Sequence, residues 1–440
     1  MVAKVHVVGA GLAGLSASLR LAEAGRSVVL HEAARQAGGR CRSYHDTALD
    51  CRIDNGNHLL IAGNSSAMEY LQAIGASDTL SGPDEPRYDF LDMGSGERWV
   101  LRPNPGRLPW WIFSSKRRIP GTGALDYLKG AALRHAGPNE AVTDRLPRGS
   151  AIFRRLWEPL AVAALNTETD TGSAQLLWRV LSESFGRGGM ACRPLIPNEG
   201  LSESLVEPAL RRLGELGGEV RFGSRLREIE QAGDRIAVLR FDEGDETLEE
   251  EDAVVLAVPP AVASRLLPDI SAPDEYRAIL NAHFRAEAPS GAPPFVGVIG
   301  GTAEWVFRKH RVLSVTVSAA DRLIDRPAAE LAEILWRDVT VAYSLPPSPL
   351  PAWQIVKEKR ATFAALPSQV AKRPQATTRW RNLALAGDWT DTGLPATIEG
   401  AIRSGVTAAA VTLAAKLPTG QRRQPADAVP PAASMAPSFS

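Results

Sequence analysis

A glycine-rich turn near the start of the chain constrains the fold more than any other feature of the sequence. The apolar run 5–8 predicts a buried parallel strand, and Gly9, Gly11 and Gly14 then turn the chain into a helix. The N-terminal N–H groups and the dipole of such a helix bind an anion such as a pyrophosphate. A second apolar strand ends in Glu32, whose carboxylate can accept hydrogen bonds from ribose hydroxyls. The spacing therefore predicts a dinucleotide site in an α/β domain.

A second glycine pair narrows the choice of dinucleotide. Gly38 and Gly39 are followed directly by Arg40. The two glycines let the backbone approach a cofactor, and the arginine can place a cation against pyrophosphate oxygens. The Glu32 carboxylate would repel a 2′-phosphate, which disfavours NADP. The combined pattern points to FAD as the cofactor.

Composition limits the classes of partner. Lys plus Arg and Asp plus Glu are equal at 50 each, so no nucleic-acid partner is expected. The three cysteines form no Cys-x-x-Cys pair, so we expect free thiols, a reducing cytoplasm and no metal site. The apolar run that comes nearest to a membrane span, 396–417, is interrupted by charges, so we expect no transmembrane segment.

Two later segments are expected to return the chain to the nucleotide. The first contains a predicted strand over 218–222, a stretch over 225–229 and a hairpin over 236–241 with its turn at 242–245. A buried strand over 253–258 follows, which Pro259 and Pro260 stop. The second, 382–401, contains a buried strand, a tight Gly-Asp turn and a helix that begins near Thr397. The N-terminus of that helix can donate N–H groups to a flavin carbonyl oxygen.

These returns divide the chain into two interleaved domains. We expect a Rossmann-like FAD-binding domain over 1–85, 198–263 and 374–417. The remaining segments, 86–197 and 264–373, should form an α+β substrate domain. The Pro-, Ala- and Ser-rich tail over 418–440 has no apolar period and is expected to be disordered.

The motifs resemble those of the flavin amine oxidase and phytoene desaturase superfamily. Three shorter elements resemble the hydroxysqualene dehydroxylases more narrowly; they are Trp157-Glu158-Pro159, Trp305-Val306-Phe307 and Thr392-Gly393-Leu394-Pro395-Ala396-Thr397. The resemblance runs from Val5 to Leu417. It implies an FAD-dependent enzyme that reductively removes an allylic hydroxyl from a C30 isoprenoid and releases squalene.

The resemblance also implies roles for individual residues. The implied FAD-binding residues are Gly9, Gly11, Leu12, Ala13, Gly14, Glu32, Gly38, Gly39, Arg40, Asn55, Gly56, Leu226, Gly387, Asp388, Pro395, Thr397 and Ile398. Leu226 would contact the adenine, Asp388 the ribityl and phosphate part, and the Ile398 N–H the flavin ring. Trp157, Trp305 and Phe307 would line the substrate pocket, and the last two alternate along a predicted strand and so share one face.

The chemistry requires a proton donor. Hydroxide is a poor leaving group, so an acid should protonate it as the C–O bond breaks. His58 lies in the segment that the resemblance places near the flavin, and an imidazole can act near neutral pH. His283 and Glu304 are weaker candidates.

Several partners follow from the same hypothesis. Gly297 to Gly301 lacks the following helix and the ribose acid of a second nucleotide site, so electrons are expected from an external donor. Upstream synthases of the squalene pathway are further expected partners. Segment 108–120 places four bulky apolar residues before three cations, which favours docking on an anionic membrane; a buried turn is the alternative. We therefore expect a cytoplasmic protein peripherally associated with the cytoplasmic membrane.

Three other functions stay open at this point. A phytoene-type desaturase would take hydride from a similar polyprenyl chain, and an amine oxidase would need a pocket for a nitrogen substrate. Escort proteins for prenylated GTPases share this fold and bind isoprenoid without redox chemistry. The intact glycine, Glu32 and Gly387-Asp388 motifs argue against the escort function.

Overall fold

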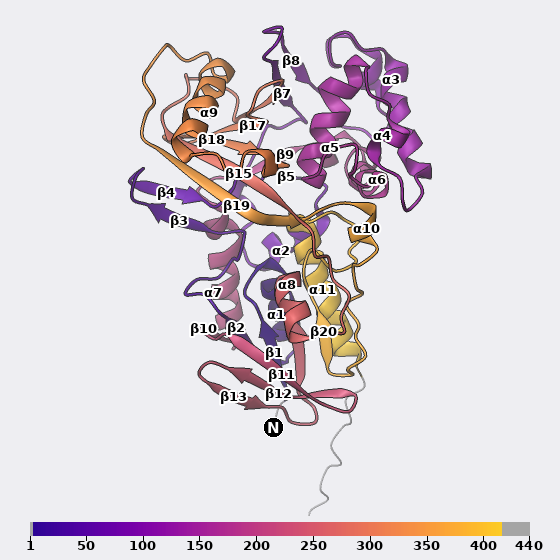
Figure 1. Cartoon of the computed structure of the whole chain (residues 1–440), viewed down its shortest axis with the longest axis vertical. Helices are drawn as coiled ribbons and strands as arrows, with labels where there is room; N and C mark the ends of the chain where they lie inside the picture. Colours follow the sequence, from indigo (N-terminus) through magenta and orange to yellow (C-terminus); the bar gives the residue numbers. More distant parts are fainter. Residues whose placement is uncertain (1–2, 416–440) are drawn as a thin grey trace, which may run out of the picture.

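The computed structural model describes residues 3–415, and the predicted tail over 418–440 lies outside them. The described residues form two parts that lie end to end along the long axis of the molecule (Figure 1). One part holds a parallel sheet, and the other holds an antiparallel sheet with a group of helices beside it. Each sheet collects strands from distant segments, so the chain passes between the two parts several times.

Five parallel strands form the sheet that carries the glycine-rich turn. Their order is β10-β2-β1-β14-β20, and every neighbouring pair is parallel. Their bounds are β1 Lys4–Val8, β2 Ser27–Glu32, β10 Glu219–Phe222, β14 Ala253–Leu256 and β20 Leu383–Leu385. β14 and β20 are buried throughout, as expected of a parallel sheet that helices cover on both faces. All five strands lie where the sequence predicts them.

Helices pack closely on this sheet. Their bounds are α1 Leu12–Glu23, α2 Ser65–Ala73, α7 Glu207–Glu215, α8 Pro260–Leu266 and α11 Ile398–Ala414. α1 and α11 pack in close contact. A Cβ at Gly405 of α11 would overlap the carbonyl oxygen of Ala13 in α1. The predicted hairpin is also present, as β11 Leu226–Ala232, β12 Arg235–Phe241 and β13 Gly244–Thr247, at the far end of this part (Figure 1).

Seven strands form the second sheet, in the order β19-β15-β18-β17-β16-β7-β8. Their bounds are β7 Tyr88–Asp92, β8 Arg98–Leu101, β15 Tyr276–Arg285, β16 Phe295–Ile299, β17 Trp305–Lys309, β18 Val312–Val317 and β19 Trp353–Phe363. Neighbours are antiparallel except β16 and β7. Helix α9 (Ala328–Ala342) covers one face, where alternate residues such as Leu280, Phe284 and Val315 form a core with Leu335 and Trp336.

Short helices and turns share a hydrophobic core with the other face. Their bounds are the 3₁₀ turn Trp110–Phe113, α3 Ala124–Leu128, the 3₁₀ stretch Lys129–His135, α4 Val142–Arg145, the π-helical turn Phe153–Trp157, α5 Glu158–Leu165 and α6 Ala174–Glu183. Two smaller sheets complete the strands. β3 Ser43–Asp46 and β4 Cys51–Asp54 form a hairpin, and β9 Pro194–Pro197 pairs with β5 Leu60–Ile61 and β6 Leu80–Ser81 from a distant segment. Helix α10 spans Pro367–Val370.

Cys41, Cys51 and Cys192 are free thiols, as predicted. Within residues 3–415, none of the helices has the length and apolar character needed to cross a bilayer.

Candidate active site

Two glycines of the first turn are required by the packing of the protein itself. Gly9 has a φ of +105°, and a Cβ there would lie 2.5 Å from the carbonyl oxygen of Ala257, just after β14. A Cβ at Gly14 would overlap the carbonyl oxygen of Gly9. These positions allow the tight passage from β1 into α1.

Gly11 has a different reason to be glycine. It is the N-cap of α1, and a Cβ built on it would meet no protein atom within 4 Å. A cap without a side chain leaves the first-turn N–H groups, including those of Leu12 and Ala13, available to a ligand. Gly38 pairs with Gly11 in a β-bridge, and a Cβ on Gly39 would lie 3.6 Å from the Gly11 Cα. The structure thus brings both glycine motifs to one open helix N-terminus, which fits a pyrophosphate.

Glu32 lies at the end of β2 beside this turn. Its two carboxylate oxygens accept the backbone N–H groups of Ala10 and Ala34, each at 2.8 Å. Each oxygen keeps a further acceptor site for a ribose hydroxyl. The Ser224 N–H donates to the Glu32 carbonyl oxygen at 2.9 Å, which brings the start of β11, with the buried Leu226, to the same end of the sheet.

Glu32→Ala is expected to weaken FAD binding by about 1.5 to 3 kcal/mol, the usual range for a hydrogen-bonding charged group. The dissociation constant can be measured by fluorescence titration of the apoprotein with FAD. Glu23→Ala, an exposed carboxylate at the end of α1, is the matched control. Unchanged FAD affinity in a folded Glu32→Ala protein would show that Glu32 does not hold the ribose.

Arg40 and Asp388 join the first and last FAD segments. Nη2 of Arg40 lies 2.7 Å from each Asp388 carboxylate oxygen, and Nη1 donates to the Ala361 carbonyl oxygen at 2.6 Å. Burial of the Arg40 guanidinium lowers its pKa, but the neighbouring Asp388 carboxylate raises it by more. On balance the pKa of Arg40 is raised. The Arg40 side chain is 42% accessible, so a ligand can reach it. Gly387 holds the turn before Asp388 with a φ of +147°, where a Cβ would overlap the Trp389 indole.

The N-terminus of α11 lies next along the chain. The Thr397 hydroxyl caps the helix by accepting the Gly400 N–H at 3.0 Å, as the sequence predicts. Such a cap satisfies one of four first-turn N–H groups and leaves those near Ile398 for a ligand. The Glu399 carboxylate turns away to accept two N–H groups of α2. Pro395 is buried just before the cap.

A polar network fixes the loop after β4 to the antiparallel sheet. The Asn57 side-chain amide donates to the Thr316 hydroxyl at 3.1 Å, and that hydroxyl donates to the Asn281 side-chain oxygen at 2.8 Å. A Cβ on Gly56 would lie 3.0 Å from Asn281 Nδ2, and Asn55 Nδ2 donates to the Arg40 carbonyl oxygen at 3.4 Å. Asn281 and Thr316 were not predicted from the sequence; the available signal was a polar residue in an otherwise apolar strand.

His58 follows this loop and lies deep in the protein with a partly accessible side chain. Burial lowers its pKa, with the Asp54 carboxylate opposing and the Arg40 guanidinium adding to the effect. The imidazole is therefore largely neutral at pH 7, and it can still donate an N–H. Because the charge of Arg40 acts on His58, the imidazole lies in the same region as the residues that fit FAD.

The two weaker acid candidates are engaged elsewhere. His283 is buried in β15, its Nδ1 lies 2.8 Å from the Ser314 hydroxyl, and burial lowers its pKa to about 4. Glu304 directly precedes Trp305, so alternation directs it to the α9 side of the sheet. Its carboxylate accepts the Ser318 N–H at 2.7 Å, and burial raises its pKa to about 7.

Aromatic rings cover part of the sheet face opposite α9. The ring of Trp305 lies 5.6 Å from that of Phe90 and 5.9 Å from that of Phe295, and Phe307 lies 6.1 Å from Phe295. The predicted shared face of Trp305 and Phe307 is therefore present. Thr316, which pairs with Trp305 in the sheet, connects these rings to the Asn57 loop.

Trp157 is placed differently from the other predicted pocket residues. It is buried in the π-helical turn before α5, and its ring packs so closely on Gly130 that a Cβ there would lie 2.7 Å from it. The indole N–H has no hydrogen-bond partner among the described residues. The structure gives Trp157 a place in the helical core.

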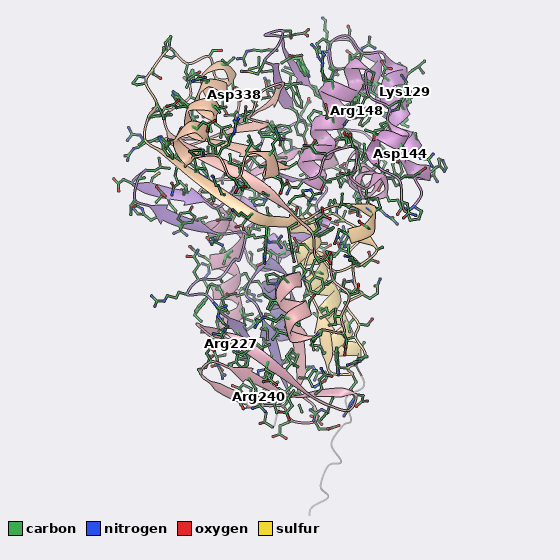
Figure 2. All side chains as sticks on the ribbon, viewed as in Figure 1. Lys129, Asp144, Arg148, Arg227, Arg240 and Asp338 are labelled. Carbon is green, nitrogen blue, oxygen red and sulfur yellow. The ribbon has the colours of Figure 1, made fainter. Side chains whose placement is uncertain are left out.

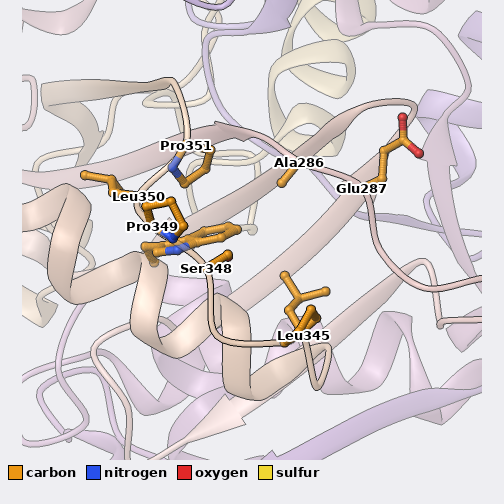
Figure 3. A pocket seen from close by; sticks show the side chains of 9 residues that line it. Ala286, Glu287, Leu345, Ser348, Pro349, Leu350 and Pro351 are labelled. Carbon is orange, nitrogen blue, oxygen red and sulfur yellow. The ribbon is translucent and has the colours of Figure 1, made fainter.

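A separate pocket lies on the α9 side of the antiparallel sheet (Figure 3). Its volume is about 340 Å³, and its walls include Ala286, Glu287, Trp336 and the loop 345–351. Trp336 packs on Phe284, with ring centroids 5.2 Å apart, on the face opposite Asn281. This pocket is therefore distinct from the flavin site.

Comparison with known proteins agrees with a flavin site at these residues. A family described as flavin containing amine oxidoreductase matches residues 12–413. The hydroxysqualene dehydroxylase of Rhodopseudomonas palustris is 50% identical over 412 residues, which cover 93% of this chain and 98% of that protein. A 15-cis-phytoene desaturase from an Oncidium hybrid is 24% identical and covers 91% of this chain and 76% of that protein. The solved structure of cyclohexylamine oxidase from Brevibacterium oxydans matches with a TM-score of 0.68 at 16% identity, over 94% of this chain and 99% of that one, which shows a shared fold.

The cradle and the comparisons lead to one assignment of family and cofactor. The open Gly11 position, the uncapped N-terminus of α1, the remaining first-turn N–H groups of α11 and the accessible Arg40 fit FAD. The chain is a member of the flavin-containing amine oxidoreductase family, and within it belongs with the hydroxysqualene dehydroxylases.

Proposed function

We propose that this chain removes the hydroxyl of hydroxysqualene reductively to give squalene. The observation that carries the proposal is the 50% identity to a hydroxysqualene dehydroxylase over 93% of the chain, together with a complete FAD cradle. The phytoene desaturase is a much more distant relative, at 24% identity. The likeness to cyclohexylamine oxidase supports the fold alone.

The residues of the chain would assist the departure of the hydroxyl. Bound reduced FAD would supply the hydride that forms the new C–H bond. We propose that His58 donates a proton to the leaving oxygen, so that the broken C–O bond releases water. The rings of Trp305 and Phe90 can stabilise positive charge on the allylic carbon by about 0.5 to 2 kcal/mol each. The polar network of Asn57, Thr316 and Asn281 would hold the loop beside them.

The residues named as FAD contacts fall into three groups in this proposal. The turn residues Gly9 to Gly14 and Gly38 to Arg40 would hold the pyrophosphate, while Glu32 and Leu226 would hold the ribose and adenine. The third group, around Asp388 and Ile398, would hold the ribityl chain and the flavin ring. Trp305 and Phe307 would form one wall of the substrate pocket, and Trp157 would support it from the helical core.

The proposal includes an external electron donor and a membrane setting. Gly297 and Ile299 lie within strand β16 rather than before a helix, so this glycine-rich segment would not bind a nicotinamide dinucleotide. A separate reductase, quinol or diffusing carrier would reduce the flavin. Because the substrate is an apolar C30 lipid, we propose peripheral association with the cytoplasmic membrane, close to the synthases that make the substrate.

The decisive experiment follows electrons and product together. Holoprotein that has been reduced under anaerobic conditions is mixed with hydroxysqualene, and flavin absorbance and squalene are measured. One flavin should be reoxidised for each squalene formed. Squalene formed without flavin oxidation would contradict the mechanism. Reaction with phytoene or an amine, but not with hydroxysqualene, would overturn the proposed function in favour of the corresponding alternative.

A further inference from the structure

Exposed apolar side chains gather at one end of the molecule. Nine large apolar side chains are exposed among residues 3–415, and six of them lie close together. These six, called here the docking surface, are Leu108 (63% exposed), Trp110 (66%), Phe113 (66%), Leu125 (75%), Leu128 (53%) and Met190 (40%). The other three, Phe222, Val341 and Leu413, lie on separate elements.

Contacts beneath the docking surface make it continuous. The rings of Trp110 and Phe113 lie 6.2 Å apart. Trp111 packs edge-on against Tyr127 of α3 at 4.8 Å, which joins the 3₁₀ turn to the helix that carries Leu125 and Leu128. The Met190 N–H donates to the Pro105 carbonyl oxygen at 3.1 Å, which brings Met190 beside the loop before Leu108.

The structure corrects which residues of segment 108–120 can meet a partner. The sequence pattern treated Trp110 to Phe113 as one apolar contact, but Trp111 and Ile112 are buried. A 3₁₀ turn directs successive side chains around its axis, so Trp111 and Ile112 anchor the turn while Trp110 and Phe113 point outward. The buried-turn alternative therefore holds for two of the four residues.

Cations border the docking surface, with Arg107, Lys116 and Lys129 exposed and Arg117 and Arg118 partly buried. From Arg107 to Lys129 the chain carries five cations and one acid, whereas the whole chain has 50 of each. The acid, Asp126, is already occupied by Lys129 at 2.8 Å and by the Gly123 N–H at 2.9 Å. An apolar patch bordered by cations complements an anionic bilayer, where rings enter the interface and cations meet the headgroups.

The docking surface is also well placed in the molecule. Helix α3 and Lys129 lie at the end opposite the β11–β12 hairpin, which carries Arg227 and Arg240 (Figures 1 and 2). A bilayer at this end would leave the parallel sheet and its dinucleotide cradle in water. The helical group that bears the docking surface shares a hydrophobic core with Trp305.

We propose that the docking surface inserts into the interface of an anionic lipid bilayer and holds the substrate domain against it. The inference rests on the proposed function only for the identity of the lipid substrate, because the surface itself is defined by exposure and charge. The six apolar side chains enter the headgroup boundary, and Arg107 and Lys116 contact anionic headgroups.

Vesicle sedimentation with the holoprotein tests the proposal. Wild-type protein should sediment with phosphatidylglycerol vesicles and less with phosphatidylcholine vesicles, and binding should fall as salt rises. The double variant Trp110→Ser/Phe113→Ser should bind about 10- to 100-fold more weakly, because two exposed rings no longer enter the interface. The double variant Phe222→Ser/Val341→Ser removes two other exposed apolar side chains, each 45% exposed, and should bind like wild type. Full FAD content and an unchanged melting temperature would show that the variants are folded.

Activity measurements separate this inference from the proposed function. Trp110→Ser/Phe113→Ser should lose turnover of hydroxysqualene embedded in vesicles but keep turnover of detergent-dispersed substrate. If wild-type protein binds vesicles but converts neither vesicle-embedded nor detergent-dispersed hydroxysqualene, the proposed function fails and the docking surface stands. The inference is overturned if wild type ignores anionic vesicles, if the Trp110/Phe113 variant sediments like wild type, or if the patch instead mediates self-association that this variant abolishes.

Discussion

Gly14→Ala is expected to give a protein that folds poorly and retains no FAD, whereas Gly11→Ala is expected to give a folded protein that binds FAD weakly. The added Cβ at position 14 overlaps the backbone carbonyl of Gly9, which no side-chain rotation relieves, so a loss of about 3 kcal/mol or more in stability is expected. At position 11 the Cβ meets open space in the protein and would occupy the volume of the pyrophosphate. FAD affinity should therefore fall about 10- to 100-fold with little change in the apoprotein.

Thermal unfolding of the apoprotein and FAD titration distinguish the two effects. Gly214→Ala, at a helical position of α7 where a Cβ also meets open space, is the control for a harmless glycine replacement. If Gly11→Ala binds FAD as tightly as wild type, the cofactor does not approach this turn. If Gly14→Ala melts like wild type, the backbone relaxes around the overlap, and the turn is less constrained than the structure indicates.

His58→Gln is expected to lower the rate of squalene formation by about 10²- to 10⁴-fold, the usual contribution of a general acid. The pKa of His58 is lowered, so its imidazolium forms only as the pH falls below the ordinary value of 6.5. The wild-type rate under single-turnover conditions should therefore rise toward acid pH and level off below the lowered pKa. This limb of the pH profile should be absent in the variant.

His45→Gln provides the matched control, since His45 lies in the neighbouring β3 strand and its side chain is 61% exposed. FAD content should be unchanged in both variants, which separates proton donation from cofactor binding. A His58→Gln rate within twofold of wild type, or an unchanged pH profile, would remove His58 from the mechanism and leave the proton donor to another group.

Local patterns were sufficient to predict the nucleotide half of the fold. The strands β1, β2, β14 and β20 are short, largely apolar runs followed by glycine or proline or ending in an acid, β10 is a short strand before Gly223, and the start of α11 is marked by Thr397. These signals act within a few residues, so they are readable without knowledge of tertiary contacts. For the same reason the turn at Gly9 and the carboxylate at Glu32 could be placed in advance.

Contacts between distant strands could not be predicted in the same way. The network of Asn57, Thr316 and Asn281 depends on the register of β15 against β18, and the sequence alone does not specify that register. The burial of Trp111 depends on Tyr127, which lies in the next helix. The aromatic face illustrates both cases, since the alternation of Trp305 and Phe307 was visible but their neighbours Phe90 and Phe295 were not.

The Arg40–Asp388 pair has a consequence for the biogenesis of the protein. Its two partners are separated by 348 residues of chain. At a synthesis rate of about 5 to 20 residues per second, the ribosome needs roughly 20 to 70 s after Arg40 before Asp388 is made. During that interval the nascent glycine turn and Glu32 exist without the carboxylate, the β20 strand or the α11 N-terminus that complete the cradle. We therefore expect acquisition of FAD to be a late event that coincides with closure of the parallel sheet, so that the cofactor stabilises the finished protein rather than guiding the first folding steps.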